Sequence, residues 1–163
     1  MTHPSRPTRR DPAIRAAAID AILPEVIEWL DGEDADDVRD DLIACLDEDG
    51  YAFAKALENR CYWDPDAELV ELLGGLNLYA ALRAAEKAWV EEHGITVPLA
   101  VGDRVLLRGQ EAVIVKIEAE TAHVIAQPVK PDGANYGATG GWFHPFEEAA
   151  PVASASPEQE LAS

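Results

Sequence analysis

The chain has 163 residues, of which 48% are hydrophobic, and its formal net charge is −18. This length and composition exclude a disordered chain and predict one domain, or one medium and one very small domain. No apolar run reaches the roughly 18 to 20 residues of a membrane-spanning helix, and the arginines before Ala16 are not followed by the apolar stretch of a signal peptide. A cytoplasmic protein is therefore expected.

The elements predicted along the chain begin with a basic, proline-containing arm at residues 1–11, which is expected to be disordered. Asp11 and Pro12 then indicate the start of a helix, because an N-cap acid followed by proline is typical of helix starts. Pro24 is expected to kink or break this helix, since proline lacks the amide hydrogen that the helix needs.

Further helices are predicted from the spacing of apolar residues. A stripe that starts near Asp34 predicts a helix that stops at Gly50, and similar stripes predict helices at 51–62, after Asp64 and up to His93. Residues 12–97 are thus expected to form an acidic all-α domain of four to six helices.

Acidic residues are concentrated in one part of this helical region. Thirteen of the thirty residues from Asp20 to Asp49 are Asp or Glu, and Arg39 is the one base among them. Interleaved apolar residues allow the segment to fold, so a structured acidic face is predicted. Seven acids form the candidate partner-binding site, named here the acidic surface: Asp31, Glu33, Asp34, Asp36, Asp37, Asp40 and Asp41.

From Val101 the apolar period changes from that of a helix to that of a strand, and short β-branched or aromatic runs follow. Residues 98–152 are expected to form a β domain with a long glycine-containing loop between Pro128 and Gly141. Residues 153–163 are expected to be a disordered tail.

The β region resembles the small SH3-like barrels of the Tudor and KOW kind, through residues 101–105, the hairpin around Gly109 and residues 141–146. The resemblance covers roughly a third of the chain. It implies an α+β protein in which the acidic helical bundle packs with a small C-terminal SH3-like antiparallel β-barrel. In Tudor relatives an aromatic cage binds methylated side chains, a role that would fall here on Tyr136, Trp142, Phe143 and Phe146; the alternative is that these aromatics fill the barrel's own core.

The acidic surface favours binding to a protein over direct binding to nucleic acid, because its negative field attracts basic grooves and repels phosphates. At a helical rise its seven charges would lie about 2 Å apart along the axis, compared with about 1.7 Å in duplex DNA. In size and charge the chain resembles acidic inhibitors encoded by phages and mobile elements, which mimic DNA and occupy the channels of restriction or CRISPR nucleases. A solubilising surface is the other interpretation.

Two function hypotheses follow. In the first, the protein is a non-catalytic inhibitor whose acidic surface occupies the nucleic-acid groove of a host defence or DNA-processing protein. In the second, it is an adaptor whose barrel binds a peptide or protein partner through Tyr136 and Trp142, with the acids serving solubility.

No catalytic, cofactor or metal motif stands out in the sequence, so no enzyme activity, cofactor or metal is predicted. Cys45 and Cys61 lie on two successive predicted helices. A disulfide between them is one interpretation, but a reducing cytosol and two apolar helix positions favour buried free thiols.

Overall fold

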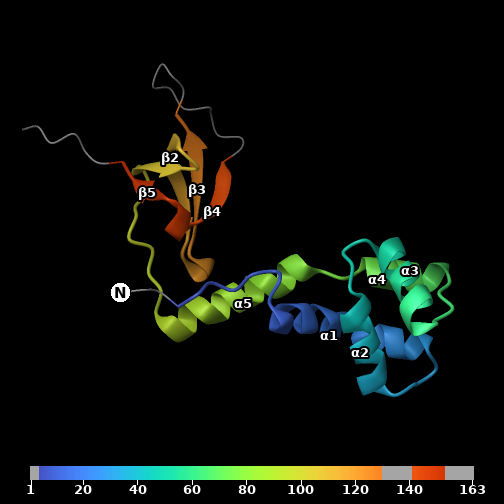
Figure 1. The fold of residues 1–163 in the computed structure, drawn as a ribbon. Coiled ribbons are helices and arrows are strands. Elements are labelled where there is room, and N and C mark those ends of the chain that lie inside the picture. Colours follow the sequence, from blue (N-terminus) through green and yellow to red (C-terminus); the bar gives the residue numbers. More distant parts are fainter. Residues whose placement is uncertain (1–3, 130–140, 153–163) are drawn as a thin grey trace, which may run out of the picture. The chain divides into compact units, whose positions relative to one another are not determined.

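The computed structural model describes residues 4–129 and 141–152, and the chain divides into two compact units, Met1–Trp89 and Val90–Ser163. Within the described residues, five α-helices precede a five-stranded antiparallel sheet (Figure 1). The predicted α+β class is therefore confirmed, with helices N-terminal and strands C-terminal. The predicted packing of helices against the sheet stays a prediction.

Asp and Asn residues start most of the helices, as expected for side chains that can accept hydrogen bonds from the first amide groups. Asp34 accepts bonds from the amides of Asp36 and Asp37, Asp49 from Ala52 and Asp66 from Leu69. Three of the chain's acidic residues therefore serve as helix caps. The helices are α1 (Pro12–Trp29), α2 (Ala35–Cys45), α3 (Gly50–Cys61), α4 (Ala67–Gly74) and α5 (Leu78–His93).

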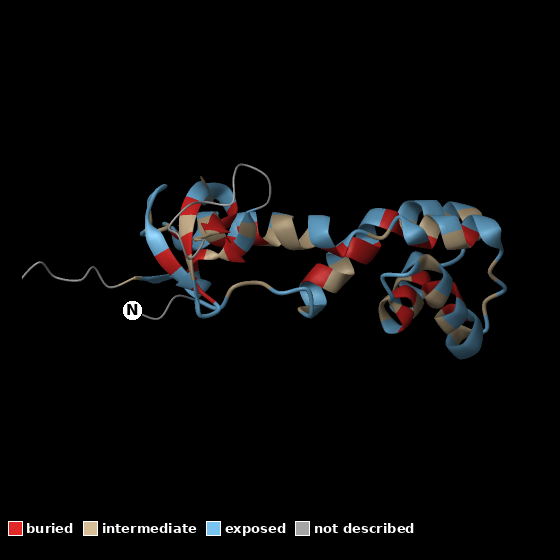
Figure 2. Cartoon of the chain, turned by 90° about the horizontal axis from the view of Figure 1, so that it is seen from above, coloured by how far each residue is buried: buried red, intermediate tan, exposed pale blue. Residues whose placement is uncertain are grey.

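The helical unit has one hydrophobic core, to which α1, α2, α3 and α4 each contribute buried side chains (Figure 2). Phe53, Leu57 and Leu73 are among its fully buried members. The same face of α2 that carries Val38 and Leu42 points into this core. The acidic residues of α2 are consequently left on its outer side.

Pro24 is predicted to kink or break the first helix; α1 continues through Pro24, so the break does not occur. A proline inside a helix costs about 3 kcal/mol. Ile22 and Val26, on either side of Pro24, are both buried in the core, and each buried aliphatic side chain contributes about 1.5–3 kcal/mol. Burial on both sides of the proline therefore offsets the lost backbone bond.

The prediction that Gly50 ends α2 is also wrong, because α2 ends at Cys45 and Gly50 is the first residue of α3. The reason is a close backbone contact with α4. A Cβ atom placed on Gly50 would lie 2.6 Å from the carbonyl oxygen of Val70 and 2.8 Å from the amide nitrogen of Gly74. Glycine at this position lets α3 start directly against α4.

The sheet is an antiparallel meander whose last strand returns to the first, in the order β4-β3-β2-β1-β5. The expected closed barrel is not found: among the described residues β4 pairs with β3 and β5 with β1, and the sheet is open between β4 and β5. Both edge strands are short and end in Pro145 and Pro151, which lack the amide hydrogen needed to extend pairing. The strands are β1 (Arg104–Leu107), β2 (Gln110–Glu118), β3 (His123–Pro128), β4 (Trp142–Pro145) and β5 (Ala150–Pro151).

Residues 4–11 of the basic arm, predicted to be disordered, make defined contacts. The guanidinium of Arg6 lies 4.8 Å from the centroid of the Trp89 ring and 3.1 Å from a carboxylate oxygen of Glu86. Arg9 forms a more exposed ion pair with Glu48 at 3.6 Å. Stacking on an aromatic face and pairing with a buried acid explain why this part of the arm is ordered. The predicted disordered tail, 153–163, lies outside the described residues.

Candidate functional site

The acidic surface lies on the loop before α2 and on the outer side of α2. Asp31, Glu33 and Asp34 belong to the loop, and α2 begins at Ala35. The spacing of about 2 Å per charge assumed that all seven acids lie on a helix. It applies only to the four acids of α2: Asp36, Asp37, Asp40 and Asp41.

Two of the seven acids have structural roles that the sequence did not reveal. Asp34 is the N-cap of α2, and Asp41 accepts a 2.8 Å hydrogen bond from the indole nitrogen of Trp63. No local sequence signal predicts the second bond, because Trp63 is far from Asp41 along the chain and follows the end of α3. These two residues are therefore poor choices for testing function alone.

The other five acids remain available to a partner. Their side chains are exposed, and within the described part of the chain none of them forms a hydrogen bond or a close ion pair through its carboxylate. The five are Asp31, Glu33, Asp36, Asp37 and Asp40. Along α2, residues three and four positions apart are neighbours on the helix surface, so Asp40 lies beside Asp36 and Asp37.

Arg39, the one base of the acidic segment, is engaged with α1 instead of balancing the acidic surface. Its guanidinium donates two hydrogen bonds to the carboxylate of Asp20, at 2.6 and 3.1 Å. The hydrogen bond from Arg39 lowers the pKa of Asp20, and the same bond raises the pKa of Arg39. The pair ties α1 to α2 and directs the hydrogen bonds of Arg39 to Asp20, while the charge of Arg39 also acts on Asp36 and Asp40.

Tyr62 is the most exposed large aromatic residue of the helical unit, at 90%. It follows α3 directly and has a left-handed backbone with φ of 60°. Its neighbours hold it at the edge of α2, because Arg60 donates a 2.7 Å bond to the carbonyl of Ala44 and Trp63 binds Asp41. A bulky residue in this conformation is uncommon, since glycine normally occupies it at helix ends.

Replacing Tyr62 with glycine is expected to raise the free energy of unfolding by about 0.5–1 kcal/mol, because glycine relieves the left-handed strain and almost no packing is lost. Chemical denaturation followed by circular dichroism would measure the change. Tyr62→Ala is the matched control, since alanine removes the ring but keeps the strain. Equal stability of the two variants would contradict the prediction.

The two cysteines lie at the C-terminal ends of α2 and α3 as free thiols; Cys45 is buried, as predicted, but Cys61 is only half-buried. Their Sγ atoms are 3.5 Å apart, and Cys45 also lies 3.6 Å from the carbonyl oxygen of Ala56. Burial raises the pKa of Cys61 to about 12, with further contributions from the hydrogen bond to Cys45 and from the Asp41 carboxylate. At neutral pH Cys61 is therefore a protonated, weakly nucleophilic thiol.

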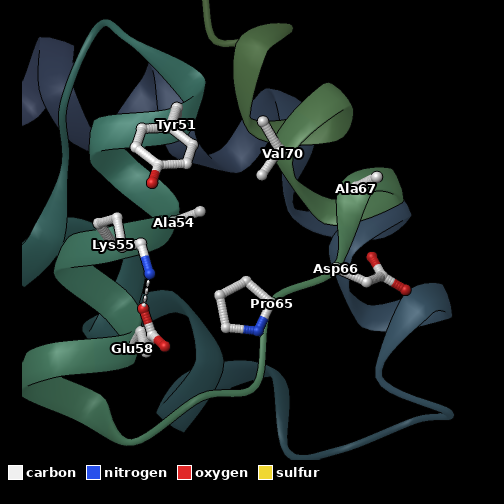
Figure 3. A pocket seen from close by; sticks show the side chains of 8 residues that line it. All are labelled: Tyr51, Ala54, Lys55, Glu58, Pro65, Asp66, Ala67 and Val70. Carbon is white, nitrogen blue, oxygen red and sulfur yellow. Dashed lines mark hydrogen bonds and ion pairs between the residues drawn. The ribbon is translucent and has the colours of Figure 1, made fainter.

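A cleft of about 430 Å³ lies between α3 and the segment that enters α4 (Figure 3). Three of the polar side chains that line it already have partners: Lys55 pairs with Glu58 at 2.5 Å, and Asp66 caps α4. The bond to Glu58 raises the pKa of Lys55. Specific small-ligand sites need polar groups that fix the orientation of the ligand, and this mainly apolar cleft offers few of them.

The second candidate site, in the β region, lies only partly within the residues that the structure describes. Tyr136 lies outside the described residues. Trp142 is half-buried at the start of β4, where it is paired with Ala126 of β3. Of the other aromatics considered for a cage, Phe146 is buried, and Phe143 is 38% exposed and stacks on His123 with ring centroids 4.2 Å apart.

Within residues 4–129 and 141–152, no three His, Cys, Asp or Glu side chains lie together in a position to hold a metal ion. Among the helices of these same residues, none has the length and apolarity needed to cross a bilayer. Comparisons with protein-family models, with curated proteins and with solved structures found no match to the chain.

Proposed function

We propose that the protein is a non-catalytic inhibitor that binds, through its acidic surface, a basic groove in a protein that itself binds nucleic acid. One observation carries this proposal: five exposed carboxylates gather on and beside one helix, and the nearest base, Arg39, is engaged by Asp20. Such a surface attracts basic grooves at long range and competes there with phosphate groups. The likeness to DNA-mimic inhibitors of phages and mobile elements remains one of size and charge.

The structure of α2 supports this proposal over a purely solubilising role in one respect. Solubility requires only that charges be spread over the surface. Here Asp36, Asp37 and Asp40 are adjacent on the outer side of one helix, and like charges at this spacing destabilise a helix by a few tenths of a kcal/mol. A partner with complementary charge would offset that cost on binding.

The proposal is tested by capture from the lysate of the natural host with the tagged full chain. We expect retained proteins that bind nucleic acid, that elute between about 0.1 and 0.5 M salt and that a short duplex DNA displaces, since screening at the higher salt shortens the range of charge interactions to a few ångströms. A partner that resists both high salt and DNA would contradict charge mimicry.

An adaptor function of the β region is the second candidate. The observation in its favour is a set of exposed apolar side chains on the sheet, including Leu106 and Phe143, in which a partner would find hydrophobic contact. The meander order with β5 returning to β1 supports a likeness to the SH3-like family, although the sheet is open. Binding through this face would be insensitive to salt, which separates it from the first proposal.

A further inference from the structure

The thiols of Cys45 and Cys61 meet at a junction that neighbouring bonds hold together. Each cysteine is the last residue of its helix. On one side of Cys61, Arg60 binds the carbonyl of Ala44, and on the other, Trp63 binds the carboxylate of Asp41. Both bonds join the chain around Cys61 to the last turn of α2 before Cys45, and the two sulfur atoms lie 3.5 Å apart.

We propose that Cys45 and Cys61 form a reversible redox pair, which a small-molecule disulfide such as glutathione disulfide oxidises to an intramolecular disulfide joining the ends of α2 and α3. The sulfur atoms need to approach by about 1.5 Å to reach disulfide bond length. This modification is independent of the acidic surface and of the function proposed for it.

The reaction begins at Cys61, because this residue is partly exposed and Cys45 is only 3% exposed. The Cys61 thiolate attacks one sulfur of glutathione disulfide, which forms a mixed disulfide and releases one glutathione. The Cys45 thiolate then attacks Sγ of Cys61 and releases the second glutathione. The two protons lost by the cysteines are taken up by the two released glutathione thiolates, so the chain loses two hydrogen atoms and the glutathione disulfide is reduced.

The surroundings of the pair make closure slow. Burial, Cys45 and Asp41 keep Cys61 protonated at neutral pH, so little attacking thiolate is present. Because little thiolate is present, the dithiol closes only under sustained exposure to a disulfide. Slow disulfide formation distinguishes this pair from the thiols of catalytic oxidoreductases, which have a low pKa and react fast.

The experiment incubates the reduced full chain with excess glutathione disulfide at about pH 8.5 until the mixture no longer changes, because the raised pKa of Cys61 leaves little thiolate at this pH. Intact mass is then measured after alkylation of the remaining free thiols. We expect the chain to lose two hydrogens, to carry no glutathione and to resist alkylation. Cys45→Ala is expected to stop at a single glutathione adduct on Cys61.

Three outcomes in the unsubstituted chain would overturn the proposal. These are a stable glutathione adduct, a covalent dimer, or two thiols that are still free once the mixture no longer changes, although the same chain unfolded in urea is oxidised in the same buffer. Closing a short loop between two helices already in contact should also raise the thermal midpoint of the oxidised form by roughly 5–10 °C. An unchanged or lower midpoint would show that the helix ends are not placed for the bond.

Discussion

Replacing Gly50 with alanine is expected to lower the free energy of unfolding of the helical unit by about 2–4 kcal/mol. The new Cβ atom would meet the carbonyl oxygen of Val70 at 2.6 Å and the backbone of Gly74, and these are main-chain atoms that cannot rotate away. Helices α3 and α4 would have to separate, which would loosen the core around Phe53 and Leu73. Urea denaturation followed by far-ultraviolet circular dichroism would measure the loss.

Gly74→Ala is the matched control for Gly50→Ala. A Cβ atom on Gly74 would have no other atom within 4 Å, and the residue ends α4. Alanine is a better helix former than glycine by up to about 1 kcal/mol, so stability is expected to stay the same or rise slightly. If Gly50→Ala were as well tolerated as this control, the close approach of α3 to α4 would be wrong.

Pro24, at which the predicted break does not occur, and Gly50, which starts a helix instead of ending one, show what local sequence rules cannot predict. Both residues commonly end helices, and the rules weigh only the backbone around them. What decided their structural roles lies elsewhere in the chain: buried neighbours keep α1 continuous through Pro24, and the approach of α4 selects glycine at the start of α3. Packing between distant segments cannot be derived from either local pattern.

In the β region, the local sequence pattern predicts the strands but not whether the sheet closes. The change to a two-residue period near Val101 correctly indicates strands, because alternation reflects which side chains face the core. Closure of a sheet depends instead on whether its edge strands are long enough to pair with each other. With β5 only two residues long and proline ending both edges, the sheet stays open.

At the candidate site, the sequence identified the acids but not their separate roles. Charge density alone placed Asp34 and Asp41 in the same set as Asp36 and Asp40. The bond from Trp63 to Asp41 appears only when the helices are assembled, whereas the cap on α2 is local, because Asp34 binds the amides two and three residues after it. This division matters in practice, because it shows which carboxylates can be neutralised without removing a bond of the fold.

The triple substitution Asp36→Asn, Asp37→Asn and Asp40→Asn is expected to weaken binding to a captured basic partner about 10- to 100-fold at about 0.1 M salt. It removes three of the five available carboxylates and no side-chain bond of the fold. Asp36 and Asp37 lie in the first turn of α2, where they favour the helix dipole, and their loss is opposed by relief of repulsion with Asp40. Circular dichroism should therefore show an intact fold.

The matched control removes the same number of charges elsewhere: Glu68→Gln, Glu71→Gln and Glu92→Gln, all exposed acids outside the acidic surface. Both variants have the same net charge, so a general effect of acidity would weaken binding equally in the two. A specific surface predicts that the aspartate variant alone loses affinity and that its remaining binding depends less steeply on salt, because fewer charge contacts are left to screen. Equal losses would assign the acids to solubility, and undiminished binding by the aspartate variant would move the partner site to the β region.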